Sequence, residues 1–365
     1  MLSYRNIYIL LLILIIIYIT YYQQTEDFGN YMFTCSNPPE LLQQVMKERG
    51  MESNDKDYDI HITCNYDECE KDVLAFENKQ GKKIFLIDGC DFIASKLELW
   101  RLLKEKYGNE ATKYMPKTHL LEEHDDYKNF PKHFEENKKK RPDQMYVLKN
   151  YEQRQEGIKL TRDLKEIMNG LSGGWYLVQD YVYDPYIISK RKINFRYYML
   201  VVCQNGKISG YAHKDGFLYY TPQFYDDKDM TFDKHITTGY IDRQVYVENP
   251  LTLQDFRDHL DKQQPGLSKK WDASAENLLN KVMAAISMKI CKNKKLDNNV
   301  RFQLFGCDIA PDSKLGCKLM EINKGPDLDA KDERDKQVKL RVQRDMMSII
   351  DPQENDIESR FVKIF

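Results

Sequence analysis

The stretch FGCDIAPDSKLGCKLMEINKGPDL, residues 305–328, has the pattern of a β-hairpin with polar side chains grouped on one face. Apolar runs precede and follow the turn-forming segment 311–313, Pro-Asp-Ser. Glu321 and Asn323 lie two residues apart on the second predicted strand, so their side chains leave the same face. Asp308, at the end of the first strand, can reach this face through the hairpin.

These three side chains are the kind of oxygen donors that a hard divalent cation prefers. Asp308, Glu321 and Asn323 would hold Mg²⁺ together with the phosphates of a substrate. On its own, the same pattern is also compatible with a polar rim on an ordinary hairpin. The order of the other motifs along the chain favours the metal site.

Length, charge and cysteine content narrow the class of protein. A chain of 365 residues exceeds what one compact core usually holds, which predicts two or three subdomains. The formal net charge of −2 offers no bulk electrostatic basis for nucleic-acid binding. The eight cysteines form no CxxC pair, which argues against a zinc ribbon. We expect them to be reduced, mostly structural thiols.

The N-terminus carries an unbroken apolar run, Ile7–Tyr22, preceded by Arg5. We interpret it as an uncleaved single-pass membrane anchor between a tail, 1–6, and a polar stalk, 23–56. A cleaved signal peptide is the alternative, but no small-x-small cleavage site follows the run. The absence of any N-x-S/T sequon favours a cytosolic catalytic body, held at the membrane by this anchor.

The rest of the chain divides by pattern into an N-terminal α/β subdomain over 57–140, a catalytic region over 141–350 and a C-terminal tail over 351–365. The expected strands are 61–64, 82–88, 145–149, 175–182 and 195–202, and the expected helices are 95–108, 251–263, 274–293 and 336–350. The charge run 135–141 is expected to be a solvated linker or loop.

Several segments of the catalytic region could bind a nucleotide. Lys149 ends a predicted strand, and a polar loop that reaches Gly157 would cover phosphates with backbone N–H groups. Lys192 and Arg196 could supply further cations to phosphate or to a carboxylate. The edge-strand N–H and C=O groups of 179–182 could bind adenine. Each segment alone also fits an ordinary surface, and no P-loop or protein-kinase motif is present.

The order of these segments resembles the tubulin–tyrosine ligase-like family, whose catalytic unit is an ATP-grasp fold. The resemblance covers residues 90–350 and is carried by KLELW…YMPKTHLL (96–121), MYVLK (145–149), VQDYVYDPYIISKRKINFRYYMLV (178–201), KHITTGY (234–240), FGCDIAPD (305–312), LMEIN (319–323) and DKQVK…D (335–345). The implied fold class is α/β: an ATP-grasp fold with a small N-terminal α/β subdomain, preceded by a single N-terminal transmembrane helix.

The resemblance implies an ATP- and Mg²⁺-dependent ligase that activates a protein carboxylate as an acyl phosphate. A free amino acid, Glu, Gly or Tyr, would then be joined to that carboxylate, with tubulin as the default acceptor protein. The implied metal ligands are Asp308, Glu321 and Asn323, and the implied catalytic residues are Arg196 and Lys192. The implied ATP contacts are Lys149, Gly157, Gln179, Asp180, Tyr181, Val182, Lys192, Asn194 and Thr237.

This chain departs from the family pattern on the nucleotide and substrate sides. The residues that differ are Asn150 for a proline, Gln155 for a glycine, Asn194 for an aspartate, Tyr219 for an arginine and Thr238 for an asparagine. Two alternatives therefore stay open. One is a membrane-anchored pseudoenzyme that binds but does not ligate, and the other is an ATP-grasp ligase whose acceptor is not tubulin.

Overall fold

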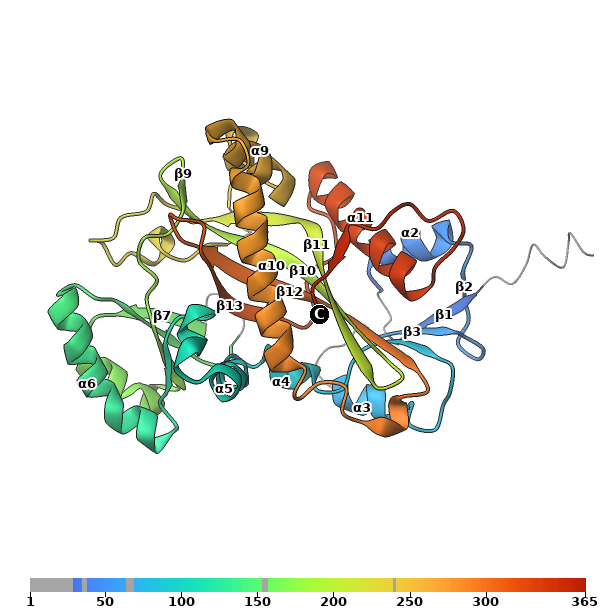
Figure 1. Ribbon diagram of the computed structural model, residues 1–365, viewed down its shortest axis with the longest axis horizontal. Helices are drawn as coiled ribbons and strands as arrows, with labels where there is room; N and C mark the ends of the chain where they lie inside the picture. Colours follow the sequence, from blue (N-terminus) through green and yellow to red (C-terminus); the bar gives the residue numbers. More distant parts are fainter. Residues whose placement is uncertain (1–28, 35–37, 64–68, 153–156, 239–240) are drawn as a thin grey trace, which may run out of the picture.

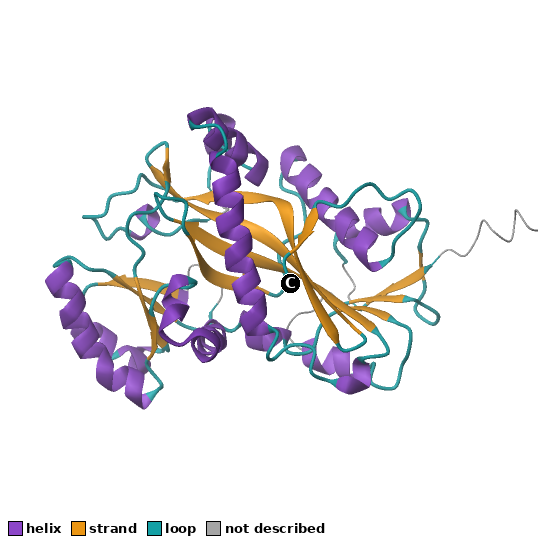
Figure 2. Cartoon of the chain, viewed as in Figure 1, coloured by secondary structure: helices purple, strands orange, loops and turns teal. Residues whose placement is uncertain are grey.

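The computed structural model describes residues 29–34, 38–63, 69–152, 157–238 and 241–365. Within these residues the chain forms a ten-stranded sheet and a four-stranded sheet, with helices packed against both (Figures 1 and 2). The architecture is therefore mixed α/β, as the sequence predicts.

The large sheet combines an antiparallel half with a parallel half. Its order is β14 (Phe361–Lys363), β11 (Lys207–Tyr220), β10 (Arg191–Gln204), β12 (Val300–Pro311), β4 (Lys83–Phe85), β3 (Ile60–Ile62), β1 (Asn30–Phe33) and β2 (Glu52–Ser53). In addition, β13 (Cys317–Asn323) pairs with β12, and β9 (Ile187–Ile188) pairs with β10. The β12–β13 pair is the hairpin that the sequence predicts.

The small sheet is antiparallel in the order β5 (Thr118–Leu120), β8 (Leu177–Asp180), β6 (Tyr146–Lys149) and β7 (Ile158–Thr161). Helix α6 (His124–Lys140) lies beside this sheet (Figure 1). Phe130 and Phe134 of α6 pack on Tyr146 with ring centroids 5.4 and 5.2 Å apart. This contact gives the small sheet its own apolar core.

Helix α10 (Leu267–Ile286) crosses one face of the large sheet (Figure 1). Trp271, Leu278, Val282 and Ile286 are buried along it at helical spacing, so one stripe of the helix faces the sheet. The remaining helices are α3 (Cys69–Leu74), α4 (Cys90–Ala94), α5 (Lys96–Tyr107), α7 (Leu164–Met168), α8 (Val245–Glu248) and α9 (Leu253–Gln263). Short 3₁₀ turns are η1 (Gly108–Lys113), η3 (Gly170–Gly173), η4 (Phe232–Lys234) and η5 (Lys294–Leu296).

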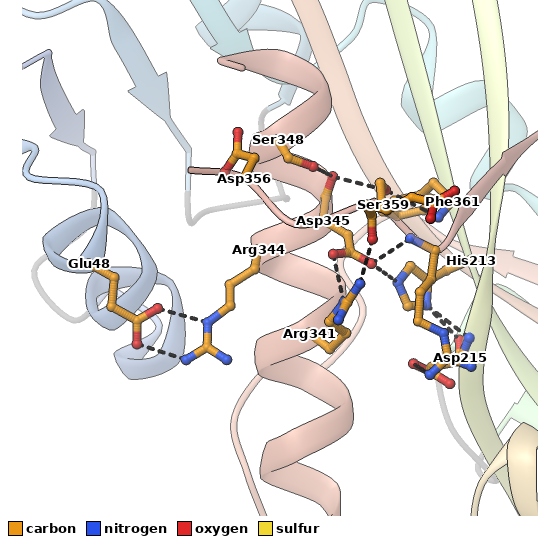
Figure 3. A network of polar contacts seen from close by, with 12 residues as sticks. Glu48, His213, Asp215, Arg341, Arg344, Asp345, Ser348, Asp356, Ser359 and Phe361 are labelled. Carbon is orange, nitrogen blue, oxygen red and sulfur yellow. Dashed lines mark hydrogen bonds and ion pairs between the residues drawn. The ribbon is translucent and has the colours of Figure 1, made fainter. Parts of the chain in front are cut away.

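Helix α11 (Glu333–Ile350) joins the C-terminal part of the chain to the sheet through one buried carboxylate. Asp345 accepts hydrogen bonds from His213 Nε2 at 3.0 Å, Arg341 Nε at 2.8 Å and the Arg360 backbone N–H at 2.8 Å (Figure 3). On another face of α11, Arg344 pairs with Glu48 of α2 (Glu40–Glu48) through two contacts of 2.8 Å.

The polar stalk expected over 23–56 is a wrong prediction for the described residues Asn30–Phe33, Glu40–Glu48 and Glu52–Ser53, which form β1, α2 and β2. Helix α2 buries Leu41, Leu42, Val45 and Met46, which recur at helical spacing among polar residues. Pro39 stands at the N-cap of this helix, where proline does not interrupt the helical hydrogen bonds. The segment is part of the folded body because this apolar stripe packs into the main core.

Two further expectations are corrected. Residues 135–140 of the charge run 135–141 form the end of α6 and are not a linker, because the buried Phe130 and Phe134 hold that helix on the small sheet. Cys203 and Cys291 form a disulfide, so the expectation of reduced thiols is wrong for this pair. Cys90, Cys307 and Cys317 are buried.

The membrane anchor expected over Ile7–Tyr22 lies outside the described residues. In the part of the chain that the structure does describe, no helix combines the length and the apolar character needed to cross a bilayer. The prediction of a membrane location for the protein is corrected accordingly.

Candidate functional site

A cavity of about 1070 Å³ is lined by residues of both sheets. The small sheet contributes β6, β7 and β8, the large sheet contributes β10 to β13, and helices α5 and α11 add residues from two sides. Every predicted metal ligand and catalytic residue lines it, and so does every predicted ATP contact except Gly157. Gly157 instead precedes the lining residue Ile158.

The hairpin register brings the three predicted metal ligands together. Asp308 on β12 stands directly opposite Glu321 on β13, and Gly306 stands opposite Asn323. Asn323 Nδ2 lies 3.3 Å from Glu321 Oε1, so the amide and the carboxylate are already in contact. A register shift after Asp308 marks an irregularity at this point, a feature that often redirects side chains near functional sites.

Arg196 on β10 is the direct partner of Asp308 in the neighbouring strand pair. Its guanidinium donates from Nε to Asp308 Oδ1 at 2.5 Å and from Nη2 to Oδ2 at 3.1 Å. This two-point contact fixes the planes of both groups. Arg196 therefore presents its remaining N–H groups next to the predicted metal ligands, at the position from which it could reach a phosphate.

The two carboxyl groups have different charge environments. Burial, with a further contribution from Glu321, raises the pKa of Asp308 to about 6, although Arg196 opposes the increase. Burial also acts on Glu321, but Lys96, Lys149 and Arg196 together hold its pKa below the usual value. A divalent cation between these oxygens would relieve the repulsion that raises the pKa of Asp308, so the donor set fits Mg²⁺.

Two lysines supply buried positive charge to the cavity. Lys149, at the end of β6, is 4% exposed, and Lys192, on β10, is 6% exposed. Burial lowers the pKa of each ammonium group to about 8, and Glu321 partly opposes this for Lys149. Buried amines of this kind gain most when a polyanion binds, because its charge offsets their loss of hydration.

The predicted base-binding segment 179–182 lies where expected in the cavity but is not an edge strand. β8 is flanked by β5 and β6, and the N–H groups of Asp180 and Tyr181 already donate to Lys117 and Met145. Gln179 Oε1, however, is buried without a hydrogen-bond partner in the described protein. An amino group of a nucleotide base would satisfy this acceptor.

Asn194 presents a similar buried acceptor. Its Oδ1 has no hydrogen-bond partner among the described atoms, and the residue lines the cavity beside Lys192 and Arg196. Orphaned buried acceptors are uncommon, and two of them in one polar cavity indicate a ligand that carries N–H or O–H donors. A nucleotide offers such donors on its base and ribose, so these residues fit ATP.

The loop before Gly157 is described only at its ends, since residues 153–156 lie outside the described part of the chain. At Gly157 a Cβ atom would lie 2.2 Å from the carbonyl oxygen of Glu152 and 2.7 Å from Asn150 Oδ1. Only glycine therefore fits this loop closure. The predicted role of Gly157 in covering phosphate stays a prediction.

Lys96 is the main site residue that sequence reasoning did not assign a role. It begins α5, lines the cavity and hydrogen-bonds the Glu152 carbonyl at 2.8 Å. Burial lowers the pKa of the Lys96 ammonium group, and the charge of Glu321 partly opposes this decrease. It lies in the segment 96–121 that carries the family resemblance, and this was the available signal.

The end of the cavity at α11 also carries residues that the sequence did not single out. Asp335 and Lys339, one helical turn apart, are buried and form an ion pair of 3.1 Å. Tyr219, noted only as a departure from the family pattern, lines the cavity with the Arg196 guanidinium 5.3 Å from its ring centroid. The i, i+4 spacing of Asp335 and Lys339 is shared by many surface helices, so it gave no signal.

Two carboxylates, an amide and several buried cations in one cavity are compatible with the binding of a polyanion together with a divalent cation. Comparison with known proteins gives the family. The model of the tubulin-tyrosine ligase family matches residues 74–358, so the chain belongs to that family.

Curated relatives share modest identity with this chain. Tubulin glycylase 3B of Drosophila melanogaster is 26% identical over 223 residues, which cover 56% of this chain and 29% of that protein. The probable tubulin polyglutamylase ttll-9 of Caenorhabditis elegans is 25% identical over 288 residues, covering 72% and 64%. The probable beta-tubulin polyglutamylase of Tetrahymena thermophila is 26% identical over 297 residues, covering 74% and 24%. The chain thus spans between about a quarter and two thirds of these relatives.

Proposed function

We propose that this protein is an ATP- and Mg²⁺-dependent ligase with an ATP-grasp fold that joins an amino acid to a carboxylate of an acceptor protein. The observation that carries the proposal is the meeting of Asp308, Glu321 and Asn323 with Arg196 and two buried lysines in one cavity. The catalytic region is proposed over 141–350, with Lys96 reaching the cavity from the preceding subdomain.

We propose a role for each residue from its charge and its position in the cavity. Lys149 and Lys192 hold phosphate oxygens, and the segment 179–182 binds the base. Arg196 steadies the transferring phosphoryl group as the acceptor carboxylate attacks it, since negative charge would otherwise repel negative charge. Mg²⁺, when bound by Asp308, Glu321 and Asn323, neutralises the phosphates. The acyl phosphate, formed as ADP leaves, then reacts with the amine of the incoming amino acid, which forms the amide bond and releases inorganic phosphate.

The acceptor and the donor are proposed from the relatives. The relatives above are named as a tubulin glycylase and as probable tubulin polyglutamylases. Tubulin is therefore the first acceptor to test, and glycine and glutamate are the first donors, with tyrosine as the third family donor.

The proposal is tested by transfer of radiolabelled glycine, glutamate and tyrosine onto purified tubulin and onto lysate proteins with Mg·ATP. We expect label to depend on ATP and on Mg²⁺, and to be lost in Glu321→Gln. If no labelled amino acid exceeds the Glu321→Gln background on any acceptor, the enzymatic proposal is wrong. Label on lysate proteins but not on tubulin would identify a ligase with a different acceptor.

A catalytically inactive relative that still binds nucleotide is the second candidate. Tyr219 favours it, because its neutral ring lies against Arg196 at the position where the family pattern has an arginine. Asn194 favours it as well, since an amide replaces a carboxylate next to the phosphate-binding lysine. This candidate predicts binding of Mg·ATP in calorimetry without transfer of any amino acid.

A further inference from the structure

Two buried histidines contact adjacent residues at the end of β8, where the proposed base-binding segment begins. His133 of α6 approaches Asp180, and His235, after η4, approaches Tyr181. Their exposed fractions are 8% and 0%. Neither imidazole is among the cavity-lining groups given a chemical role above. Their hydrogen bonds nevertheless determine how this segment is held.

The contacts of His133 define its tautomer. Its Nδ1 lies 3.1 Å from the ammonium group of Lys117, which can only donate, so Nδ1 accepts. The proton of a neutral imidazole is then on Nε2, which lies 2.8 and 3.0 Å from the two carboxylate oxygens of Asp180. The amide nitrogen of Asn137, one turn further along α6, lies 3.0 Å from His133 Nε2 and donates to the Asp180 carboxylate at 3.3 Å. Asp180 is thus held from α6 by two donors.

The contacts of His235 also define its tautomer and connect it to Tyr181. Its Nε2 meets the carbonyl oxygen of Asp229, which can only accept, so Nε2 carries the proton. Its Nδ1 therefore accepts from the Tyr181 hydroxyl at 2.8 Å. The Tyr181 oxygen in turn lies 3.4 Å from Lys192 Nζ, and the same ammonium group is 4.7 Å from the Tyr181 ring centroid.

These two links differ in what they reach. The His133 link ends on the side chain of Asp180 and on β8, which lines the cavity with Gln179 and its unpartnered Oε1. The His235 link continues through Tyr181 to Lys192, a buried cation that can meet phosphate. His133 is therefore connected to the proposed base-binding end of the site. His235 is connected to both the proposed base-binding end and the proposed phosphate-binding end.

We propose that His133 and His235 are positioning residues that hold the dipeptide Asp180–Tyr181 for nucleotide binding, His133 for the base and His235 for the base and the phosphates. The inference rests on the proposed nucleotide site. Burial lowers the pKa of His235, so the imidazole stays neutral, as its accepting Nδ1 requires.

The test compares calorimetric binding of Mg·ATP with that of Mg·tripolyphosphate, which lacks base and ribose, on the full chain. His133→Ala is expected to weaken ATP binding about tenfold and to leave tripolyphosphate binding unchanged. His133→Gln restores an N–H donor near the position of Nε2 and should recover most of the ATP affinity. His235→Ala and Tyr181→Phe are expected to weaken both ligands. His124→Ala is the matched control, because His124 begins the same helix with its side chain 85% exposed.

His133→Asn keeps a polar group but loses the reach to Asp180, so it provides a second test if His133→Ala does not fold. Equal loss of both ligands in folded His133→Ala or His133→Asn, or no loss of ATP affinity in them, would overturn the inference and leave the proposed function in place. If the folded wild-type protein binds neither ligand, the proposed nucleotide site itself is wrong, and the inference falls with it.

Discussion

Asp308 and Asp345 are both largely buried, with side chains 17% and 1% exposed. Their surroundings nevertheless shift their pKa values in opposite directions. Asp345 receives hydrogen bonds from a histidine, an arginine and a backbone N–H, as Figure 3 shows. These bonds outweigh the effect of burial and lower its pKa. Asp308 has one arginine but also faces Glu321, and its pKa is raised to about 6.

This difference in pKa distinguishes a carboxylate that stabilises the fold from one that belongs to the candidate site. The Asp345 carboxylate is matched by donors from α11, β11 and the segment before β14, so its network is complete and stabilises the fold. Asp308 instead faces the like charge of Glu321, and a bound cation would relieve this repulsion. A buried carboxyl group with a perturbed pKa in a cavity is a candidate for a ligand site.

The largest effect is expected at Asp345. Asp345→Ala would leave His213 and Arg341 without their shared acceptor, and we expect the free energy of unfolding to fall by about 3–5 kcal/mol. Chemical denaturation measures this value. At temperatures where the variant stays folded, its affinity for Mg·ATP should equal that of the wild type. A loss of nucleotide affinity in the folded variant would break the proposed separation.

For the two carboxyl groups of the cavity we expect the opposite, a large loss of activity with a small change in stability. Asp308→Asn and Glu321→Gln should lower amino-acid transfer by about 10²–10³-fold, because charge neutralisation at the phosphates is lost. Their free energy of unfolding should stay within about 1 kcal/mol of wild type, since each change also removes like-charge repulsion. Transfer assays and denaturation measured side by side test this. A large loss of stability in either variant would assign the pair to the structural class.

The disulfide provides a second test of a contact that stabilises the fold and lies outside the candidate site. Cys203 at the end of β10 and Cys291 after α10 close a separation of 88 residues, and we expect reduction to cost about 2–4 kcal/mol. Thermal unfolding with and without dithiothreitol measures the effect. The Cys203→Ser/Cys291→Ser double variant is the control, because reductant should no longer change its stability. Equal stability of the reduced and oxidised wild type would show that the bond is dispensable.

The smallest effect concerns pH. Lys149 and Lys192 bind phosphate only as cations, and burial lowers the pKa of each to about 8. Above this pH the free lysines lose their protons, and nucleotide binding must restore them. We therefore expect the affinity for Mg·ATP to fall about tenfold between about pH 7.5 and about pH 9. Lys149→Arg stays charged and should weaken this dependence. Affinity that rises with pH would contradict the assignment.

The two halves of the comparison also differ in how far the sequence predicts them. The hairpin, its three oxygen donors and Lys149 at a strand end follow from two-residue alternation and turn residues, which are local signals. The Asp345 network joins residues more than a hundred positions apart, and no local pattern reports which elements will meet. The same reason explains why residues 135–140, predicted to be a linker or loop, form the end of α6, the helix that packs on the small sheet.

Strand order could not be predicted either. The segment 179–182 carries no local sign that β5, almost 60 residues earlier, covers its outer side. Helix α2 is not predicted from the sequence, although its buried residues recur at helical spacing, because the segment is polar overall and is interpreted as a stalk. The disulfide depends on the end of β10 meeting the segment after α10, which the spacing of cysteines alone does not show.

The central claim is that Asp308, Glu321 and Asn323 hold a divalent cation that binds together with a nucleotide. The most direct measurement is calorimetric titration of ATP into the folded wild-type protein, with and without Mg²⁺, next to Glu321→Gln and Asp345→Asn. We predict Mg²⁺-dependent binding that is lost in Glu321→Gln and kept in Asp345→Asn. Binding of ATP that is independent of Mg²⁺, or equal in Glu321→Gln and wild type, would contradict the claim.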